Sequence, residues 1–263
     1  MIYPDDFVNK IINADALEAL SIIPDNIIHL IITSPPYNVG MDYGVSDRKN
    51  YNNYLSFMKK VLQECYRVLI PGGRIAVNVP SSILQSSSSR MAYLSLDIVL
   101  LMREVGFLDR EWVTWIKMPK GEIAGSSTAW GSWMSPSCPY LRDACEYVIV
   151  MDKESHKRTD KSGVNDVTSE EFLKFTSNCW YIPPEKNRNH PAPFPPGLPY
   201  RLIKLYSWEN DIVLDPFVGS GTTAIVAKKC NRKFIGIDIN SEFCIMAEER
   251  LKLVSRSLGI KYA

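Results

Sequence analysis

Short apolar runs alternate with amphipathic stretches along this chain. The run 27–32 has the length of one buried strand, and 54–69 carries its apolar residues at helical spacing. The same alternation recurs in the last third. The pattern predicts strands at 7–13, 27–32, 74–79, 111–117, 147–151, 211–214 and 233–237, and helices beginning at 15, 54, 91, 224 and 240. Alternating strands and helices indicate an α/β fold with a doubly wound, mostly parallel sheet.

Three stretches interrupt this alternation. Residues 120–140 form a long irregular segment, 152–185 has the size of a small insertion, and 183–199 holds seven of the 17 prolines. Taken alone, the proline-rich stretch is typical of a linker. These features divide the chain into a first half of the main domain at 1–151, an insertion at 152–185 and a second half at 186–263.

Composition narrows the class of protein. Of the 263 residues 46% are hydrophobic and 22% charged, and the net charge is +1, so a nucleic-acid partner would need a local basic face. The six cysteines form no Cys-x-x-Cys pair and the three histidines lack metal-site spacing, which predicts a reduced, cytoplasmic protein without a metal site. Neither a signal peptide nor a membrane span is expected, because no apolar run approaches ~20 residues.

An abrupt break follows the strand 27–32. Pro35 and Pro36 fix two backbone φ angles and remove two donors, so the chain leaves the strand as a stiff, extended loop. The carboxyl ends of strands are where α/β sheets bind ligands. The Ser34 oxygen and the Pro35 carbonyl can accept both hydrogens of a planar amino group, and the Tyr37 ring can stack on the heterocycle that carries it. The alternative is a strand-to-turn connection in which the prolines only break the strand.

A second motif lies in the last third, in the order strand, glycine-containing turn, helix, strand, acidic end. Gly219 and Gly221 allow a ligand to approach closely, and Asp238 is placed to accept hydrogen bonds from two ribose hydroxyls. The turn is neither Gly-x-Gly-x-x-Gly nor a Walker loop, and Asp215 at its start disfavours phosphate. A ligand with a positive amino group and an adenosine, such as S-adenosylmethionine, fits better. A helix N-terminal carboxylate is the alternative for Asp238.

The two motifs together resemble those of the DNA amino-methyltransferases, which modify exocyclic nitrogens. Residues 32–37 resemble their catalytic Ser/Asp-Pro-Pro-Tyr/Phe motif, and residues 215–221 resemble their cofactor motif. The catalytic motif comes first, which is the β-class order. The resemblance implies a Rossmann-like, circularly permuted methyltransferase fold that binds S-adenosyl-L-methionine and carries a small inserted recognition region. It also covers the Asp15 region, 71–73, 146–150 and 190–195.

The resemblance also implies roles for individual residues. The implied catalytic set is Ser34, Pro35, Pro36 and Tyr37. The implied cofactor-binding set is Asp15, His190, Pro191, Phe194, Asp215, Phe217, Gly219, Ser220, Gly221, Thr222 and Asp238. The stretch around His190 would pack beside the cofactor, which competes with the linker interpretation. Asp15 would contact the cofactor adenine, although an ordinary helix-start carboxylate explains it as well. The fold would place the strands that end at Ile32 and Asp215 side by side.

The expected reaction is methylation of the N4 amino group of cytosine in double-stranded DNA, with the base flipped out of the duplex. In this family Ser34 before the two prolines is more typical of cytosine-N4 enzymes, and an aspartate there of adenine-N6 enzymes. Adenine-N6 methylation, methylation of RNA and a non-catalytic nucleotide- or DNA-binding module are the alternatives. We also expect the protein to belong to a restriction-modification system with a cognate endonuclease and to form a homodimer. No single residue of the sequence supports either expectation by itself.

Candidate DNA contacts lie in the loops 81–90 and 120–140, because these loops should flank the crevice. The basic residues between 153 and 161 stand among acidic ones. We therefore interpret that run as a solvated charged face and not as a DNA-binding surface.

Overall fold

The structure is a computed structural model that describes residues 6–39, 50–84, 91–117, 144–160, 163–185 and 195–254. The loop 120–140, most of the loop 81–90 and the stretch around His190 lie outside the described residues. Within the described ranges, no helix is long and apolar enough to cross a membrane.

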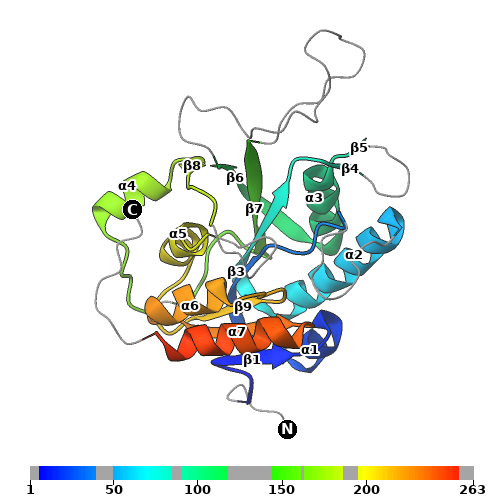
Figure 1. Cartoon of the computed structure of the whole chain (residues 1–263). Helices are drawn as coiled ribbons and strands as arrows, with labels where there is room; N and C mark the ends of the chain where they lie inside the picture. Colours follow the sequence, from blue (N-terminus) through cyan, green and yellow to red (C-terminus); the bar gives the residue numbers. More distant parts are fainter. Residues whose placement is uncertain are drawn as a thin grey trace.

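An eight-stranded sheet forms the centre of the molecule (Figure 1). Its order is β1-β10-β9-β2-β3-β7-β6-β8, and β7 runs antiparallel to both of its neighbours while the other pairs are parallel. The central strands are apolar on both faces, as expected for a sheet that is covered on both sides. The strands are β1 (Lys10–Asn13), β2 (Ile28–Thr33), β3 (Leu69–Pro80), β6 (Phe107–Ile116), β7 (Cys145–Lys153), β8 (Cys179–Tyr181), β9 (Ile212–Asp215) and β10 (Lys233–Asp238), with β4 (Ile83–Leu84) and β5 (Met91–Ala92) in a separate two-stranded sheet.

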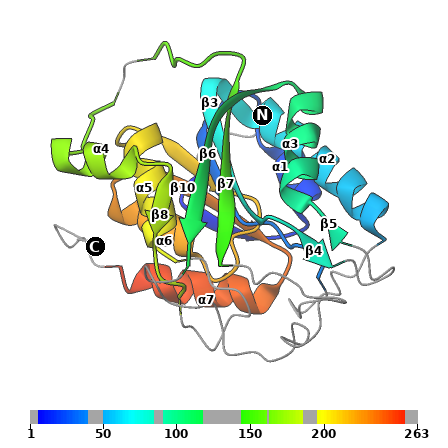
Figure 2. The same cartoon turned by 90° about the horizontal axis from the view of Figure 1, so that it is seen from above.

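Helices cover both faces of the large sheet (Figures 1 and 2). One hydrophobic cluster joins α1, α2 and α3 to one face, and a second joins α5, α6 and the end of α7 to the other. The helices are α1 (Ala16–Ile22), α2 (Tyr51–Val68), α3 (Leu94–Val105), α4 (Ser169–Phe175), α5 (Gly197–Tyr206), α6 (Thr222–Lys229) and α7 (Ser241–Lys252). The predicted doubly wound, mostly parallel α/β fold is confirmed.

Local sequence signals begin and end several of these helices. Asp15 accepts a hydrogen bond from the Leu17 N–H and caps α1, while Thr168 and Glu171 form a capping box at α4. Gly106 ends α3 with a φ of 114°, a left-handed conformation that suits glycine. These caps satisfy backbone groups that the helix ends would otherwise leave without partners.

The topology gathers the two motifs at one edge of the sheet. β2 pairs with β9 through Leu30–Val213 and Ile31–Leu214, so the loop after β2 and the turn after β9 lie side by side, as predicted. β3, β6 and β10 run parallel to β2 and β9, and their carboxyl ends lie at the same edge. Because β7 is antiparallel, its first residues, Cys145 and Glu146, lie there too.

Two differences from the sequence-based prediction lie close to the motifs. β3 begins at Leu69 and passes through 71–73, five residues before the predicted strand start at 74, and a register shift against β2 accompanies the left-handed Gly72 there. α5 begins inside the proline-rich stretch 183–199, so the linker interpretation is wrong for residues 197–199. Pro199 lies in its first turn, where a helix does not need the missing N–H.

The segment 152–185 is built into the main sheet and core. Its strand β8 pairs with β6, and Phe175 and Trp180 are buried in the cluster that includes α5. The side chains of Lys153 and Arg158 are 6% and 2% exposed and take part in ion pairs. The prediction of a solvated charged face is therefore wrong for these two residues. A role of the segment in target recognition stays a prediction.

Candidate active site

The loop directly after β2 presents the predicted catalytic residues. Pro35 is buried, whereas Ser34, Pro36 and Tyr37 are partly exposed. Asn38 has a φ of 59°, a left-handed conformation that turns the chain after Tyr37. The loop therefore brings a hydroxyl, a backbone carbonyl and an aromatic ring together at the carboxyl end of a buried strand.

The Tyr37 hydroxyl is the centre of a hydrogen-bond network at this edge. It lies 2.7 Å from the Ser34 hydroxyl and 3.1 Å from Oε2 of Glu146. The Asn78 side-chain amide donates to the Tyr37 hydroxyl at 2.9 Å and to Glu146 Oε2 at 2.5 Å. Lys117 Nζ donates to Oε1 of Glu146 and forms an ion pair with it. The network joins the loop after β2 to β3, to β7 and to the end of β6.

Burial governs the electrostatics of this network. Asn78 is 2% exposed and Glu146 is 8% exposed. Burial and then the negative charge of Glu146 raise the pKa of Tyr37 well above its usual range. Tyr37 therefore carries a neutral hydroxyl at physiological pH, which can donate one hydrogen bond and accept others.

Asp215 ends β9 and begins the glycine-containing turn. It is 4% exposed, and its carboxylate accepts hydrogen bonds from the Phe217 N–H at 3.1 Å and from the Thr223 hydroxyl at 2.7 Å. Burial raises the pKa of Asp215 to about 6, and these two donors oppose the rise. Both carboxylate oxygens of Asp215 thus stabilise the conformation of the turn.

Asp238 ends β10 and faces the same turn. Its two oxygens accept hydrogen bonds from the Gly219 N–H at 2.8 Å and the Asn240 N–H at 2.9 Å. Burial raises the pKa of Asp238, and both N–H groups oppose that rise. Each carboxylate oxygen has a second lone pair, so the partly exposed Asp238 keeps the capacity to accept a hydrogen bond from a ligand hydroxyl.

The tip of the turn packs against α7. Gly221 has a φ of 86°, and a Cβ at this position would lie 2.7 Å from the Cβ of Ala247. Arg250 donates to the carbonyl and to the hydroxyl of Ser220, at 2.6 and 2.9 Å. Thr222 is buried and begins α6. Helix α7 therefore fixes the conformation of residues 219–222.

Some of the other predicted cofactor residues lie within the described ranges, and some do not. The Phe217 ring is 6.3 Å from that of Phe57, between their centroids. Asp15 lies just beyond β1, whose last residue Asn13 pairs with Asp238, so it stands at the same edge of the sheet. Its contact with the cofactor stays a prediction. Three further residues lie outside the described ranges, namely His190, Pro191 and Phe194.

Four residues of these networks had no role in the sequence analysis. Asn78 and Glu146 each place a polar side chain in or beside an apolar strand pattern, and Glu146 also begins the stretch 146–150 that the family resemblance covers, without a role assigned to it. Lys117 and Arg250 give no signal at all. Their partners become visible only when the antiparallel register of β7 and the packing of α7 are known.

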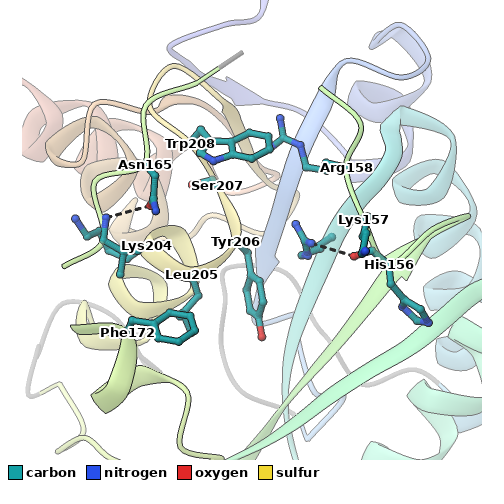
Figure 3. A pocket seen from close by; sticks show the side chains of 12 residues that line it. His156, Lys157, Arg158, Asn165, Phe172, Lys204, Leu205, Tyr206, Ser207 and Trp208 are labelled. Atoms are coloured by element: carbon teal, nitrogen blue, oxygen red, sulfur yellow. Dashed lines mark hydrogen bonds between the residues drawn. The ribbon is translucent and has the colours of Figure 1, made fainter. Parts of the chain in front are cut away.

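A cavity of about 360 Å³ lies at the opposite edge of the sheet (Figure 3). Arg74 lines it and precedes Asn78 by four residues on β3, which is roughly 13 Å along a strand. Arg158 and Lys204 also line the cavity, and Figure 3 shows Arg158 beside Trp208, whose ring is 4.2 Å from the guanidinium. Both cations are ion-paired with carboxylates of the protein. We interpret this edge as a set of ion pairs that joins the chain after β7 to the end of α5.

One group of potential metal ligands occurs in the part of the chain that the structure describes. The ligand atoms of His29, Asp160 and Asp211 lie within 4.8 Å of one another. Arg158 pairs with both carboxylates, so a positive charge already stands there. His29 Nδ1 accepts a hydrogen bond from the Ile212 N–H at 3.1 Å. These contacts are those of a structural ion-pair cluster.

Comparison with known protein families bears on both motifs. The model of N6 and N4 methyltransferases, described as DNA methylase, matches residues 28–249. The chain belongs to this family. The range that matches the DNA methylase family includes the loop after β2, the turn after β9 and Asp238.

Relatives of the DNA methylase family cover most of the chain. The Type II methyltransferase M.HpaI of Haemophilus parainfluenzae is 36% identical over 92% of this chain and 74% of its own length. The DNA adenine methyltransferase YhdJ of Escherichia coli strain K12 is 31% identical over 96% of this chain and 86% of its own. TTHA0409 of Thermus thermophilus, solved in complex with S-adenosyl-L-methionine, has a TM-score of 0.73 at 28% identity and matches over 93% of both chains.

S-adenosyl-L-methionine is the methyl donor of the DNA methylase family. The residues that the structure describes are suited to bind S-adenosyl-L-methionine. Asp238 retains acceptor capacity at a partly exposed position, and Gly219 and Gly221 allow the backbone to approach a ligand closely. The predicted cofactor is confirmed, and the assignment of its individual contacts stays a prediction.

Proposed function

We propose that this protein transfers a methyl group from S-adenosyl-L-methionine to an exocyclic amino group of a base in double-stranded DNA. One observation carries the proposal: the Ser34 loop and the Asp215 turn follow adjacent strands, β2 and β9, at one edge of the sheet. A methyl donor at the turn and an amino group at the loop would then be neighbours. Correct orientation of two reactants is by itself a large contribution to the rate.

Each residue of the loop has a distinct task in this proposal. Ser34 Oγ and the Pro35 carbonyl accept the two amino hydrogens, which draws the nitrogen lone pair out of conjugation. Pro36 keeps the loop extended, and the Tyr37 ring stacks on the base. The base must leave the duplex, because its amino group is otherwise paired and stacked. Bound S-adenosyl-L-methionine supplies an electrophilic methyl group, and the amino nitrogen becomes acidic only once it is methylated.

We propose the N4 atom of cytosine as the target. Ser34 stands before the two prolines, where an aspartate is more typical of adenine-N6 members of the family. Adenine N6 is the second candidate, and the 31% identity with YhdJ, a DNA adenine methyltransferase by name, favours it. The two candidates share every residue role given above, so the methylated nucleoside distinguishes them.

The similarity to M.HpaI, a Type II methyltransferase by name, supports a role in restriction and modification. In that role duplex DNA is the substrate, the protein acts in the cytoplasm, and a restriction endonuclease acts on the same site. A homodimer is a further part of the proposal, and analytical ultracentrifugation of the purified protein tests it.

Substitutions at Ser34 and Asp238 test the proposal by separating transfer from cofactor binding. Ser34→Ala is expected to lower single-turnover methyl transfer to duplex DNA by about 100-fold, as loss of a polar group at a reacting centre does, and to leave cofactor affinity unchanged. Asp238→Ala is expected to raise the Kd for S-adenosyl-L-methionine by about tenfold in calorimetry, because it removes a charged acceptor.

The matched control is Ser56→Ala on the exposed side of α2, which should change neither quantity. If Ser34→Ala reduced transfer and cofactor affinity equally, the role of Ser34 would be wrong. An unchanged affinity of Asp238→Ala would remove Asp238 from the cofactor site.

A further inference from the structure

A buried carboxylate beside the proposed catalytic loop has no task in the reaction described above. Glu146 is 8% exposed, its Oε2 is hydrogen-bonded to Tyr37 and Asn78, and Lys117 pairs with its Oε1. A buried carboxylate stays ionised only where it is paired and hydrogen-bonded, and both conditions are met here. Any catalytic task for Glu146 rests on the proposed function.

Hydrogen-bonding capacity determines the direction of each bond in this network. An ionised carboxylate only accepts, so Asn78 must turn its amide N–H groups toward Glu146 and Tyr37. The Tyr37 hydroxyl has two acceptors, the Asn78 carbonyl at 3.4 Å and Glu146 Oε2 at 3.1 Å, and its proton points to Glu146 because that acceptor is nearer and charged. The Tyr37 oxygen is then an acceptor, and the Ser34 hydroxyl donates to it across 2.7 Å.

This direction determines what Ser34 offers to a substrate. Its proton is directed at Tyr37, and Asn78 Nδ2 makes only a long contact of 3.5 Å to Ser34 Oγ, so a lone pair of Ser34 Oγ remains for a substrate hydrogen. We propose that Glu146 is a positioning residue that acts through Tyr37: it orients Ser34 Oγ as the acceptor of an amino hydrogen, and it takes up the proton that the reaction releases.

Proton release follows the same series of hydrogen bonds. The methylated nitrogen is positively charged, loses one proton to Ser34 Oγ and keeps the electron pair of that N–H bond. Ser34 passes its own proton to Tyr37 Oη, and Tyr37 passes its proton to Glu146 Oε2. The methylamino group and both hydroxyls end neutral, and Glu146 ends as a carboxylic acid. No oxidant, reductant or further reactant takes part.

Two titratable groups face Glu146 among the described residues, Tyr37 and Lys117. The Lys117 side chain is 27% exposed and that of Glu146 is 11% exposed, so the lysine links the buried carboxylate to the solvent. Its ammonium balances the charge of Glu146 before the proton arrives. The path from the amino nitrogen therefore ends close to the surface and not in the core.

The test compares single-turnover methyl transfer to duplex DNA in Glu146→Gln, Tyr37→Phe and the double variant. Glu146→Gln keeps the size of the side chain but removes the proton acceptor, and Tyr37→Phe keeps the ring but removes the hydroxyl. Each is expected to lower the rate about 100-fold, and the double variant at most about threefold further, because both changes interrupt one path. Glu104→Gln, which breaks only an exposed ion pair with Lys59, is the matched control and should transfer at the wild-type rate.

A conservative variant separates proton uptake from a purely structural contact. Glu146→Asp retains a carboxylate and is expected to transfer faster than Glu146→Gln, while all variants keep the wild-type cofactor affinity in calorimetry. Additive losses in the double variant, or equal rates of Glu146→Asp and Glu146→Gln, would overturn the inference. If the wild-type protein transfers no methyl group to DNA, the proposed function fails instead.

Discussion

At the scale of single residues, Asp215 in the turn after β9 makes the stability of the protein depend on pH. Burial raises its pKa to about 6, against 3.8 for a free aspartate. Between these two values the folded protein binds a proton that the unfolded chain does not bind. Stability therefore decreases as the pH rises through this window, and the contribution of protonated Asp215 is fully present only below it.

Substitution of Asp215 by asparagine removes this titration and retains an acceptor for the Phe217 N–H. The free energy of unfolding of the wild type relative to Asp215→Asn is expected to decrease by about 2 kcal/mol from about pH 4 to about pH 7, because one pKa unit corresponds to about 1.4 kcal/mol. Urea unfolding at a series of pH values measures both proteins. Parallel stability curves would contradict a raised pKa of Asp215.

Residues were predictable from the sequence where a motif is contiguous. Ser34 to Tyr37 and Asp215 to Gly221 each stand within a few positions, and their chemistry can be read before any fold is known. Asn78 and Glu146 are 68 positions apart, and their hydrogen bond exists only because β3 and β7 pair in one antiparallel register. The register of that pairing depends on contacts between residues far apart in the chain, so it cannot be inferred from the residue types at the two positions.

At the scale of elements, the turn between β9 and α6 depends on a close contact with α7. Gly221→Ala is expected to lower the free energy of unfolding by at least about 2 kcal/mol, because a φ of 86° is strained for alanine and its Cβ would meet Ala247 at 2.7 Å. Thermal or urea unfolding measures the loss.

The matched control for this change is Gly197→Ala at the start of α5. A Cβ there would lie 3.3 Å from Ile182, and Gly197 has no left-handed φ. Alanine also favours the helix, so the control is expected to alter stability by less than about 1 kcal/mol. Equal losses at Gly221 and Gly197 would contradict the contact with α7 as the cause.

Elements were predictable where the hydrophobic period is long and regular. α2, α6, α7 and the strands β2 and β10 lie close to their predicted positions. α5 was missed because prolines surround its start, although helices tolerate proline in the first turn. β8 was missed because it has three residues, of which only Trp180 is buried, and so it shows no period.

At the scale of the whole molecule, both ends of the chain contribute to one sheet. β1 pairs with β10, and β9 lies between β10 and β2, so the two predicted halves 1–151 and 186–263 complete each other. This arrangement explains how a catalytic motif early in the chain and a cofactor motif late in the chain come to lie side by side. The opposite edge, with its ion pairs around Arg158, holds the segment after β7 in place.

The central claim is that the site at the carboxyl ends of β2 and β9 methylates an amino group in DNA. Mass analysis of the nucleosides of duplex DNA, after incubation with the purified protein and S-adenosyl-L-methionine, tests it most directly, with Ser34→Ala as the control. N4-methyldeoxycytidine is the predicted product, and N6-methyldeoxyadenosine would keep the mechanism but correct the base. If no methylated nucleoside formed in DNA of varied sequence while the cofactor still bound, the central claim would be contradicted.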